Sequence, residues 1–354
     1  MAYTTIDKSS DYFNTVLYSG SASTLSVTGV GFQPDWIWIK RRNATANHKL
    51  TDSIMGAGLA LSITASAEVS QTGIASFDSD GFTLGTGSAD HNTSGGTYAS
   101  WNWLGSNTTA SNTNGSITST VSVNTTAGFS IVSWTGSGAD ATIGHGLSQA
   151  PTIFILKNRS DSFDWRIGQV LTSSNNMTDG NGYYMELNST KASTNPGSAT
   201  TWGATPTAPT SSVFTVGSAN AHNASGDNMV AYCFHSVKGY SKMGTYTGNG
   251  STNGTFVYTG FKPAFVIIKR TSGTSNWTLW DTTRQENEIN KPLWADLTNA
   301  EAAQTTVKLD LLSNGFKIRG TGTNVGLSGS TYIYMAFAEN PFVTGAVKLP
   351  STAR

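Results

Sequence analysis

The chain of 354 residues carries one sequence pattern three times. An aromatic residue, a Ser or Thr and a Gly occur in this order at Tyr18-Ser19-Gly20, Trp134-Thr135-Gly136 and Tyr246-Thr247-Gly248, in steps of 116 and 112 residues. Each tripeptide is followed by a strand-like block that ends in a lysine, and the three lysines are Lys40, Lys157 and Lys269. Self-similarity at a fixed period constrains the architecture more strongly than any single residue does. We therefore expect three similar folding units.

Two further landmarks complete each repeat. A turn followed by a short strand begins at Ser79, Ser211 and Ser313. A Ser-Gly turn then opens a closing strand, and these turns are Ser94-Gly95, Ser225-Gly226 and Ser328-Gly329. A residue kept in all three copies is expected to serve the fold, so residues that differ between the copies are the better candidates for function.

The residue pattern predicts an all-β protein. Apolar residues alternate or form short runs rich in Val, Ile, Thr and aromatics, bounded by Gly, Asn and Ser, which is typical of strands. We expect three tandem antiparallel β-sandwich domains of the jelly-roll or lectin-like type, with long loops, over residues 1–112, 113–240 and 241–354. Trp36–Ile39 and Phe265–Ile268 are apolar at every position, so these strands should be covered on both faces.

Long excursions separate each lysine block from the following turn. The widest runs from Asn175 to Pro209, and it reads as a variable loop at one end of the β scaffold, where binding residues commonly lie. The best helical pattern lies in another excursion, from Leu293 to Thr305, and Ser62–Val69 is expected to hold a turn of helix.

Composition narrows the range of partners. The chain has 21 basic and 21 acidic residues, and only 12% of its residues are charged. Nucleic-acid binders and anionic-membrane binders normally need a basic surface, so neither partner is expected. No apolar run approaches the ~20 residues of a membrane-spanning helix, and the first residues lack the pattern of a secretory signal. The one cysteine, Cys233, is expected to be a small core residue.

The candidate metal and catalytic residues differ between the repeats. Asp78–Gly81 resembles the start of a calcium loop, but the other copies replace its carboxylates, so a turn is favoured. No two of the histidines have the spacing of metal ligands. His91 and His222 occupy equivalent places, with Thr323-Asn324 as the expected counterpart, and are interpreted as turn caps in preference to ligand-binding residues.

Acidic residues gather in the long excursion of repeat 3, interleaved with Arg284 and Lys291. No two of these carboxylates can be assigned as the catalytic pair of a glycosidase. A solvated face with ion pairs is therefore favoured. These residues are Asp281, Glu286, Glu288, Asp296 and Glu301. The sequence thus predicts no catalytic residue, no cofactor and no metal site.

Aromatic residues outside the repeated positions are the remaining candidates for binding. An exposed tryptophan offers a flat apolar face and one hydrogen-bond donor, which suits a pyranose ring and also suits a protein interface. Interface contact or local packing is favoured over glycan contact, and the sequence alone does not separate them. Together with the two histidines above, the candidate carbohydrate- or partner-binding residues are Trp202, Trp280, Trp294, Tyr183, Tyr184, His91 and His222.

The repeated phrases resemble a family of virion proteins from tailed bacteriophages, many of them marine, that are often labelled tail fibres. The resemblance covers Tyr12 to Phe342 and is carried by Phe32–Arg41, Ser79–Gly85, Thr247–Gly250 and Tyr332–Glu339. It implies a virion location, other virion proteins as partners, a homo-oligomer and no catalytic residues. The chain lacks the long shaft of a full tail fibre, which leaves a head fibre, a tail tip or a capsid-surface protein open.

From these observations we expect a non-enzymatic bacteriophage surface protein of the tail-fibre or receptor-binding type that adheres to host-surface glycan. The alternative is a purely structural capsid decoration, head-fibre or tail component. A polysaccharide hydrolase is a weaker third reading.

Overall fold

The computed structural model describes residues 4–70, 73–286 and 289–341, and this part of the chain is built almost wholly from antiparallel strands. The only helical segments in it are a 3₁₀ turn at Ser9–Asp11 and α1 at Asn220–Asn223. No helix within the described ranges is long and apolar enough to cross a membrane. The predicted all-β fold is confirmed.

Each repeat pairs a large sheet with a small one, and all ladders are antiparallel. Repeat 1 has the sheet β1 (Phe13–Ser19), β9 (Thr97–Trp103), β3 (Trp36–Arg41), β4 (Lys49–Asp52), β5 (Leu59–Ser62), β6 (Val69–Ser70) and the small sheet β2 (Leu25–Thr28), β8 (Gly81–Leu84), β7 (Ile74–Asp78). Repeat 2 has the sheet β10 (Ala110–Asn112), β11 (Ser119–Asn124), β12 (Phe129–Thr135), β18 (Asn228–Phe234), β14 (Ile153–Asn158), β15 (Arg166–Gln169), β16 (Met185–Glu186) and the pair β13 (Ala141–Gly144), β17 (Val213–Val216). Repeat 3 has the sheet β19 (Ser241–Thr247), β26 (Thr331–Pro341), β21 (Phe261–Arg270), β22 (Thr278–Asp281), β23 (Leu293–Trp294) and the small sheet β20 (Phe256–Tyr258), β25 (Gly315–Ile318), β24 (Leu309–Leu312).

Five strands of each large sheet follow the same spatial order. The order is β1-β9-β3-β4-β5 in repeat 1, β12-β18-β14-β15-β16 in repeat 2 and β19-β26-β21-β22-β23 in repeat 3. The strand that carries the repeated lysine lies third in each. Its apolar run is buried on both faces in Trp36–Ile39 and in Phe265–Ile268, as predicted. β10 pairs with β11 although it precedes the expected boundary at residue 113.

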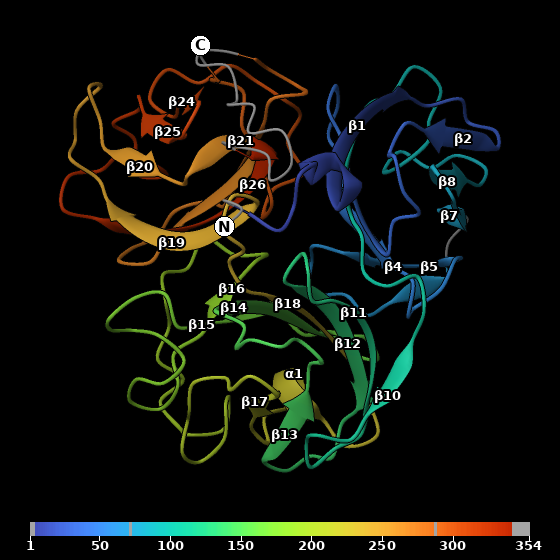
Figure 1. The fold of residues 1–354 in the computed structure, drawn as a ribbon, viewed down its shortest axis with the longest axis vertical. Helices are drawn as coiled ribbons and strands as arrows, with labels where there is room; N and C mark the ends of the chain where they lie inside the picture. Colours follow the sequence, from blue (N-terminus) through green and yellow to red (C-terminus); the bar gives the residue numbers. More distant parts are fainter. Residues whose placement is uncertain (1–3, 71–72, 287–288, 342–354) are drawn as a thin grey trace.

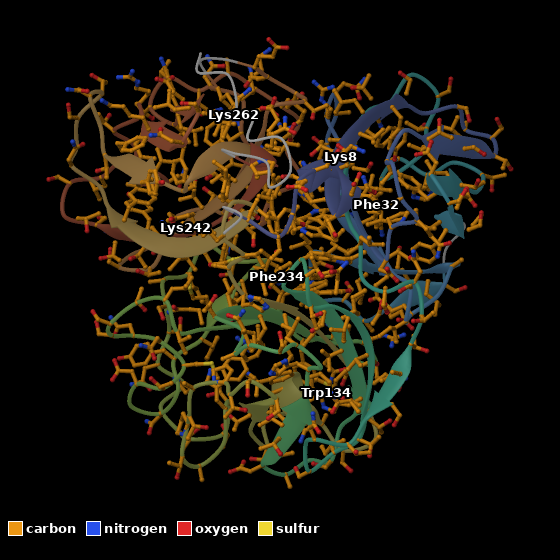
Figure 2. All side chains as sticks on the ribbon, in the orientation of Figure 1. Lys8, Phe32, Trp134, Phe234, Lys242 and Lys262 are labelled. Carbon is orange, nitrogen blue, oxygen red and sulfur yellow. The ribbon has the colours of Figure 1, made fainter. Side chains whose placement is uncertain are left out.

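The three large sheets face a common centre. Figure 1 shows three lobes around this centre: repeat 1 in blue and cyan, repeat 2 in green, repeat 3 in orange and red. One hydrophobic core contains side chains from all three repeats, and each repeat has a second core of its own between its large and small sheets. Figure 2 places Phe234 where the lobes meet and Trp134 inside the lobe of repeat 2.

Equivalent residues at the ends of the closing strands meet at this centre. The ring of Phe337 lies 5.7 Å from that of Trp103 and 6.0 Å from that of Phe234, measured between centroids. Trp36, from the central strand of repeat 1, lies 6.0 Å from Phe234 and 4.3 Å from Tyr232 of repeat 2. Burying one large aromatic ring stabilises a fold by roughly 2–3 kcal/mol. A repeat separated from the other two would expose these rings and lose that stabilisation.

Each of the three repeated lysines is fully buried and bonds to a neighbouring repeat. Its ammonium donates to a backbone carbonyl in that neighbour's excursion as well as to carbonyls of its own repeat, and burial lowers its pKa from 10.5 to about 8. The bonds between repeats are Lys40 Nζ to Thr298 O (2.8 Å), Lys157 Nζ to Ala65 O (3.3 Å) and Lys269 Nζ to Ser189 O (3.1 Å). Repeat 1 thus bonds to repeat 3, repeat 2 to repeat 1 and repeat 3 to repeat 2, which closes a ring.

A second set of bonds follows the same ring. The residue before β4, β15 and β22 donates a ring N–H to the last carbonyl of the short strand in the neighbouring repeat. The bonds are His48 Nε2 to Trp294 O, Trp165 Nε1 to Ser62 O and Trp277 Nε1 to Glu186 O, each 2.8 Å long. His48 therefore stands where the other repeats have tryptophan, and its Nδ1 accepts a bond from Trp38 Nε1 (2.8 Å).

A third set of bonds lies two residues beyond each lysine. Here a backbone carbonyl accepts an N–H from the neighbouring excursion, and two of the three joints add an ion pair. The backbone bonds are Glu301 N to Arg42 O (2.8 Å), Glu68 N to Arg159 O (2.8 Å) and Ser193 N to Thr271 O (3.1 Å). The ion pairs join Arg42 to Glu301 (2.8 Å) and Arg159 to Glu68 (2.6 Å).

The predicted helices at Leu293–Thr305 and Ser62–Val69 are wrong for the same reason. In a helix the backbone N–H and C=O groups bond to one another within the segment. In the excursions these groups serve the joints: the carbonyl of Thr298 accepts from Lys40, and the carbonyl of Ala65 accepts from Lys157. Parts of the excursions, which the sequence analysis interpreted as loops available for binding, therefore hold the repeats together.

We predict that loss of one joint bond destabilises the whole ring. Trp165→Phe removes the N–H that Ser62 O accepts, whereas Trp36→Phe removes a buried N–H that has no partner among the described residues. Because both changes remove a similar ring area, Trp165→Phe should lower the free energy of unfolding by about 1–2 kcal/mol more than Trp36→Phe. Urea unfolding followed by fluorescence measures both values. Equal losses, or unfolding of repeat 2 alone in a separate transition, would contradict the joint's role.

Candidate functional site

The three tryptophans that are candidate binding residues are buried. Trp202 and Trp280 have no exposed surface, and Trp294 is 9% exposed. Trp202 Nε1 donates to Tyr183 O (2.9 Å), and its ring packs edge-on against Phe154. These rings fill the space between large and small sheets, in the outer cores of their repeats, which agrees with the local packing that the sequence left open.

Tyr183, Tyr184 and His222 lie near Trp202. The two tyrosines are half-buried, and the guanidinium of Arg166 lies 4.3 Å from the Tyr184 ring centroid. His222 is buried, with its ring 4.7 Å from that of Trp202 and 6.2 Å from that of Tyr184. Neither nitrogen of His222 has a partner in the described structure, and burial lowers its pKa well below 6.5. Trp202 and Tyr184 belong to the outer core of repeat 2, and His222 packs against both, so a binding role of these three residues has no support in their geometry.

The residue of repeat 3 that occupies the position of His91 and His222 is Val325. The expected counterpart, Thr323 in Thr323-Asn324, lies two residues before it, so that expectation is wrong. Tyr18 Oη donates to His91 O, and Tyr246 Oη donates to Val325 O, both at 2.8 Å. Gly326, which follows Val325, accepts at its carbonyl the same turn bond as Asn223 does in repeat 2. Val325 is fully buried in an apolar cluster. The position is therefore a core position, which a histidine occupies in two of the repeats.

The acidic residues of the repeat 3 excursion are mostly engaged, and the solvated face expected there is wrong in part. Arg284 is buried and pairs with Asp281 (2.5 Å) and with Glu301 (2.8 Å). Desolvation by burial is the largest single influence on the pKa of Arg284, and it acts to lower this pKa. The charges and hydrogen bonds of Asp281 and Glu301 together act more strongly in the opposite direction, so the pKa of Arg284 is raised. Asp296 accepts the backbone N–H of Trp277 (2.9 Å). Glu288 lies outside the described residues.

Other sequence candidates behave as turn or core residues. Asp80 accepts the N–H groups of Gly31 (2.7 Å) and Gly29 (3.1 Å), which lowers its pKa and closes a turn, as favoured over a calcium loop. Cys233 is buried as predicted, and burial raises the pKa of its thiol. Within the described ranges no three His, Cys, Asp or Glu side chains are grouped to hold a metal ion.

The sequence prediction missed an exposed aromatic pair on β20. Phe256 is 43% and Tyr258 55% exposed, and they flank the buried Val257, so both rings project from the outer face of the small sheet of repeat 3. Lys242 Nζ lies 5.4 Å from the Tyr258 ring centroid and donates to Tyr258 O (2.8 Å). Among the described residues the only other exposed large apolar side chain is Val69.

A comparison of the repeats could have revealed this pair. The buried residue between the rings pairs with a phenylalanine in every repeat: Val27 with Phe82, Ile143 with Phe214 and Val257 with Phe316. This register aligns the flanking positions, which are Ser26 and Thr28 in repeat 1, Thr142 and Gly144 in repeat 2, and Phe256 and Tyr258 in repeat 3. Aromatic rings thus occur at this place only in repeat 3.

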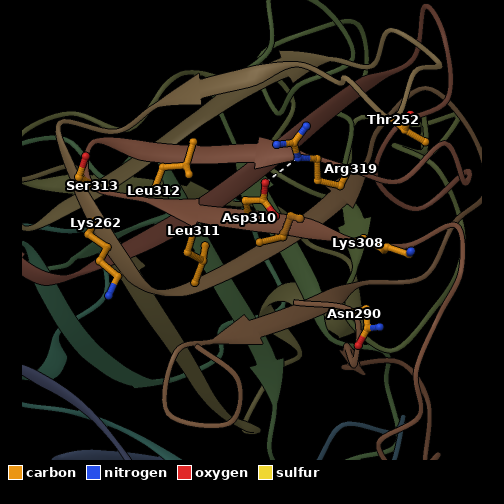
Figure 3. A pocket seen from close by; sticks show the side chains of 10 residues that line it. Thr252, Lys262, Asn290, Lys308, Asp310, Leu311, Leu312, Ser313 and Arg319 are labelled. Carbon is orange, nitrogen blue, oxygen red and sulfur yellow. Dashed lines mark hydrogen bonds and ion pairs between the residues drawn. The ribbon is translucent and has the colours of Figure 1, made fainter. Parts of the chain in front are cut away.

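A groove of about 650 Å³ lies along β24, the far strand of the same small sheet. Figure 3 shows it from close by, with the ion pair between Arg319 and Asp310 (2.5 Å) in its wall. Lys262, which pairs with Glu339 (2.5 Å), stands at one end, and Lys308 stands at the other. The remaining lining residues are Thr252, Asn290, Leu309, Leu311, Leu312 and Ser313. β24 and β20 are separated by β25, so the groove and the aromatic pair are about 9.5 Å apart, two strand spacings.

The sequence matches the family described as "Domain of unknown function (DUF7483)" over residues 8–341, and the chain belongs to this family. One continuous match covers all three repeats, which agrees with the closed ring of three repeats being the unit that defines the family. No curated protein and no solved structure matches the chain.

We predict opposite effects of one substitution at two buried histidines. The unfolded chain binds a proton at His222 below about pH 6.5, whereas the folded chain, in which the pKa is lowered, does not; stability is therefore lost as the pH falls. His222→Leu should remove this loss and raise the free energy of unfolding at pH 5 by roughly 1–2 kcal/mol. His48→Leu should lower the free energy of unfolding at pH 7, because Trp38 Nε1 and Trp294 O lose their partner. Burial lowers the pKa of His48 as well, so at pH 5 the removed proton penalty offsets part of this loss. Urea titrations at pH 5 and pH 7 measure both, and a destabilised H222L protein at pH 5 would refute the assignment.

Proposed function

We propose that this member of the DUF7483 family is a non-enzymatic virion surface protein of tailed bacteriophages that adheres to glycan on the host surface. The virion location is proposed on the resemblance of the repeated phrases to phage virion proteins. Glycan binding is proposed on one observation, the exposed pair Phe256 and Tyr258, at a place where the other repeats carry small or polar residues.

The pair has the physical properties of a sugar-binding surface. Alternate residues of a strand lie about 6.8 Å apart on one face, so the two rings can receive neighbouring parts of one saccharide chain. The C–H face of a pyranose is apolar and stacks on an aromatic ring, while the phenol of Tyr258 supplies a donor. β20 is fixed by its ladder to β25, so little ordering is needed on binding.

A second candidate is a purely structural component of the particle. It is favoured by the place of β20 at the edge of its sheet, since β20 pairs only with β25 in the described part of the chain. An exposed edge strand with apolar side chains is also a surface for pairing with another protein chain. Under this proposal the aromatic pair contacts another virion protein or a further copy of this chain.

We predict that Phe256→Ala with Tyr258→Ala reduces binding to host cells or to purified host-surface polysaccharide. Each ring should contribute about 1 kcal/mol, so the double variant should bind at least tenfold more weakly. Surface plasmon resonance on immobilised polysaccharide measures this. The matched control is Ser26→Ala with Thr28→Ala, which alters the same strand positions of repeat 1 and should leave binding and thermal stability unchanged.

Two results would decide against glycan adhesion. Undiminished polysaccharide binding by the F256A/Y258A protein would exclude this surface. Loss of the protein from assembled particles in that double variant, with no polysaccharide binding by the unaltered protein, would favour the structural candidate.

A further inference from the structure

We propose that the saccharide held on this surface is acidic, and that its anionic groups are received by the cations of repeat 3 beside the aromatic pair. This inference rests on the proposed function and specifies its ligand class. It is carried by charge, by the groove and by the difference between the repeats.

Five cations lie on or beside the small sheet of repeat 3, and two carboxylates partly neutralise them. Arg319 pairs with Asp310, and Lys262, from the neighbouring strand β21, pairs with Glu339. Lys242, which lies against the Tyr258 ring, Lys308 and Lys317 form no ion pair within the described residues. The surface therefore carries an excess of three positive charges on a chain whose net charge is zero.

These cations lie next to the aromatic rings. Phe256 pairs in register with Lys317, and Lys317 pairs with Asp310, so the three side chains follow one another across the same face of the sheet. Arg319 and Lys308 stand at the same end of the groove as Asp310. A saccharide stacked on Phe256 would therefore extend over Lys317 toward the groove, where its next acidic groups would meet Lys308 and Arg319.

The charge pattern is specific to repeat 3. The register places Lys317 where the other repeats have Thr83 and Thr215. Arg319, one residue past the strand, corresponds to Gly85 and Gly217 in the same register. A scaffold requirement would act on all three copies, because all three build this sheet pair. The cations and the rings thus occur together on one copy, as expected of a binding surface and not of the fold.

The groove suits an extended polar ligand. Its volume of about 650 Å³ lies within the range of small-molecule sites, and seven of its ten lining residues have hydroxyl, amide or charged side chains. Because the cations are solvent-accessible, their attraction to a ligand is screened by salt. Binding of an acidic saccharide should therefore weaken as the ionic strength rises, whereas stacking on the rings should not.

The test compares four probes with the full-length protein: oligogalacturonate, which carries carboxylates, dextran sulfate, which carries sulfates, uncharged dextran, and inorganic polyphosphate, which is acidic but is not a saccharide. Isothermal titration calorimetry at 50 mM and 300 mM NaCl gives the affinities. The variant is Lys308→Gln with Lys317→Gln, which removes two charges that form no ion pair. The control is Lys8→Gln, which removes one exposed charge of repeat 1 that pairs with Asp11.

We expect at least one acidic saccharide to bind more tightly than dextran at 50 mM NaCl, and the double variant to bind it about tenfold more weakly while the control does not change. The preferred acidic saccharide identifies carboxylate or sulfate as the recognised group. Equal affinity for dextran and both acidic saccharides would overturn the inference and leave glycan adhesion standing. Equally tight binding of inorganic polyphosphate would also overturn it, since saccharide would then be unnecessary. Absence of binding to every saccharide, host polysaccharide included, would overturn the proposed function as well.

Discussion

The structure depends on burying three lysine ammonium groups whose hydrogen-bond acceptors come from two different repeats. A buried ammonium is costly unless it is hydrogen-bonded. In each repeat the central strand ends with such a lysine, its own repeat supplies one or two carbonyl acceptors, and a carbonyl of the neighbouring excursion adds another. The same neighbour satisfies an indole or imidazole N–H and a backbone carbonyl. Because each repeat is both donor and acceptor, the arrangement is complete only when the ring is closed.

Closure of the ring explains where function can lie. Residues that build the joints and the shared core are engaged in every repeat, and changes there affect stability before they affect binding. The outer faces of the small sheets are free of this constraint, because they face away from the centre. One of these faces, in repeat 3, has acquired two exposed rings and an excess of positive charge. The proposed division is therefore between three copies that hold the scaffold together and one copy that binds.

The repeats, the all-β fold, the doubly buried lysine strands and the buried Cys233 could be predicted from the sequence, because each depends on local pattern. The ring could not, because bonds from lysine to distant carbonyls leave no pattern in spacing. A lysine at the end of an apolar strand in all three copies was nevertheless a signal that its charge is needed inside. The sequence left local packing and binding open for Trp202 and Trp280, because lack of repetition does not show whether a ring is exposed. Phe256 and Tyr258 were missed because only the register aligns them with Ser26 and Thr28.

The central claim is that the three repeats form one cooperative unit, and native-state hydrogen exchange tests it most directly. The amides of Glu68, Ser193 and Glu301 each donate across a different joint. If closure of the ring is required for each repeat, these three amides should exchange with the same opening free energy, equal to that of global unfolding. Exchange of one of them through a much cheaper opening, with the other two still protected, would show that a repeat leaves the ring by itself and would contradict the account.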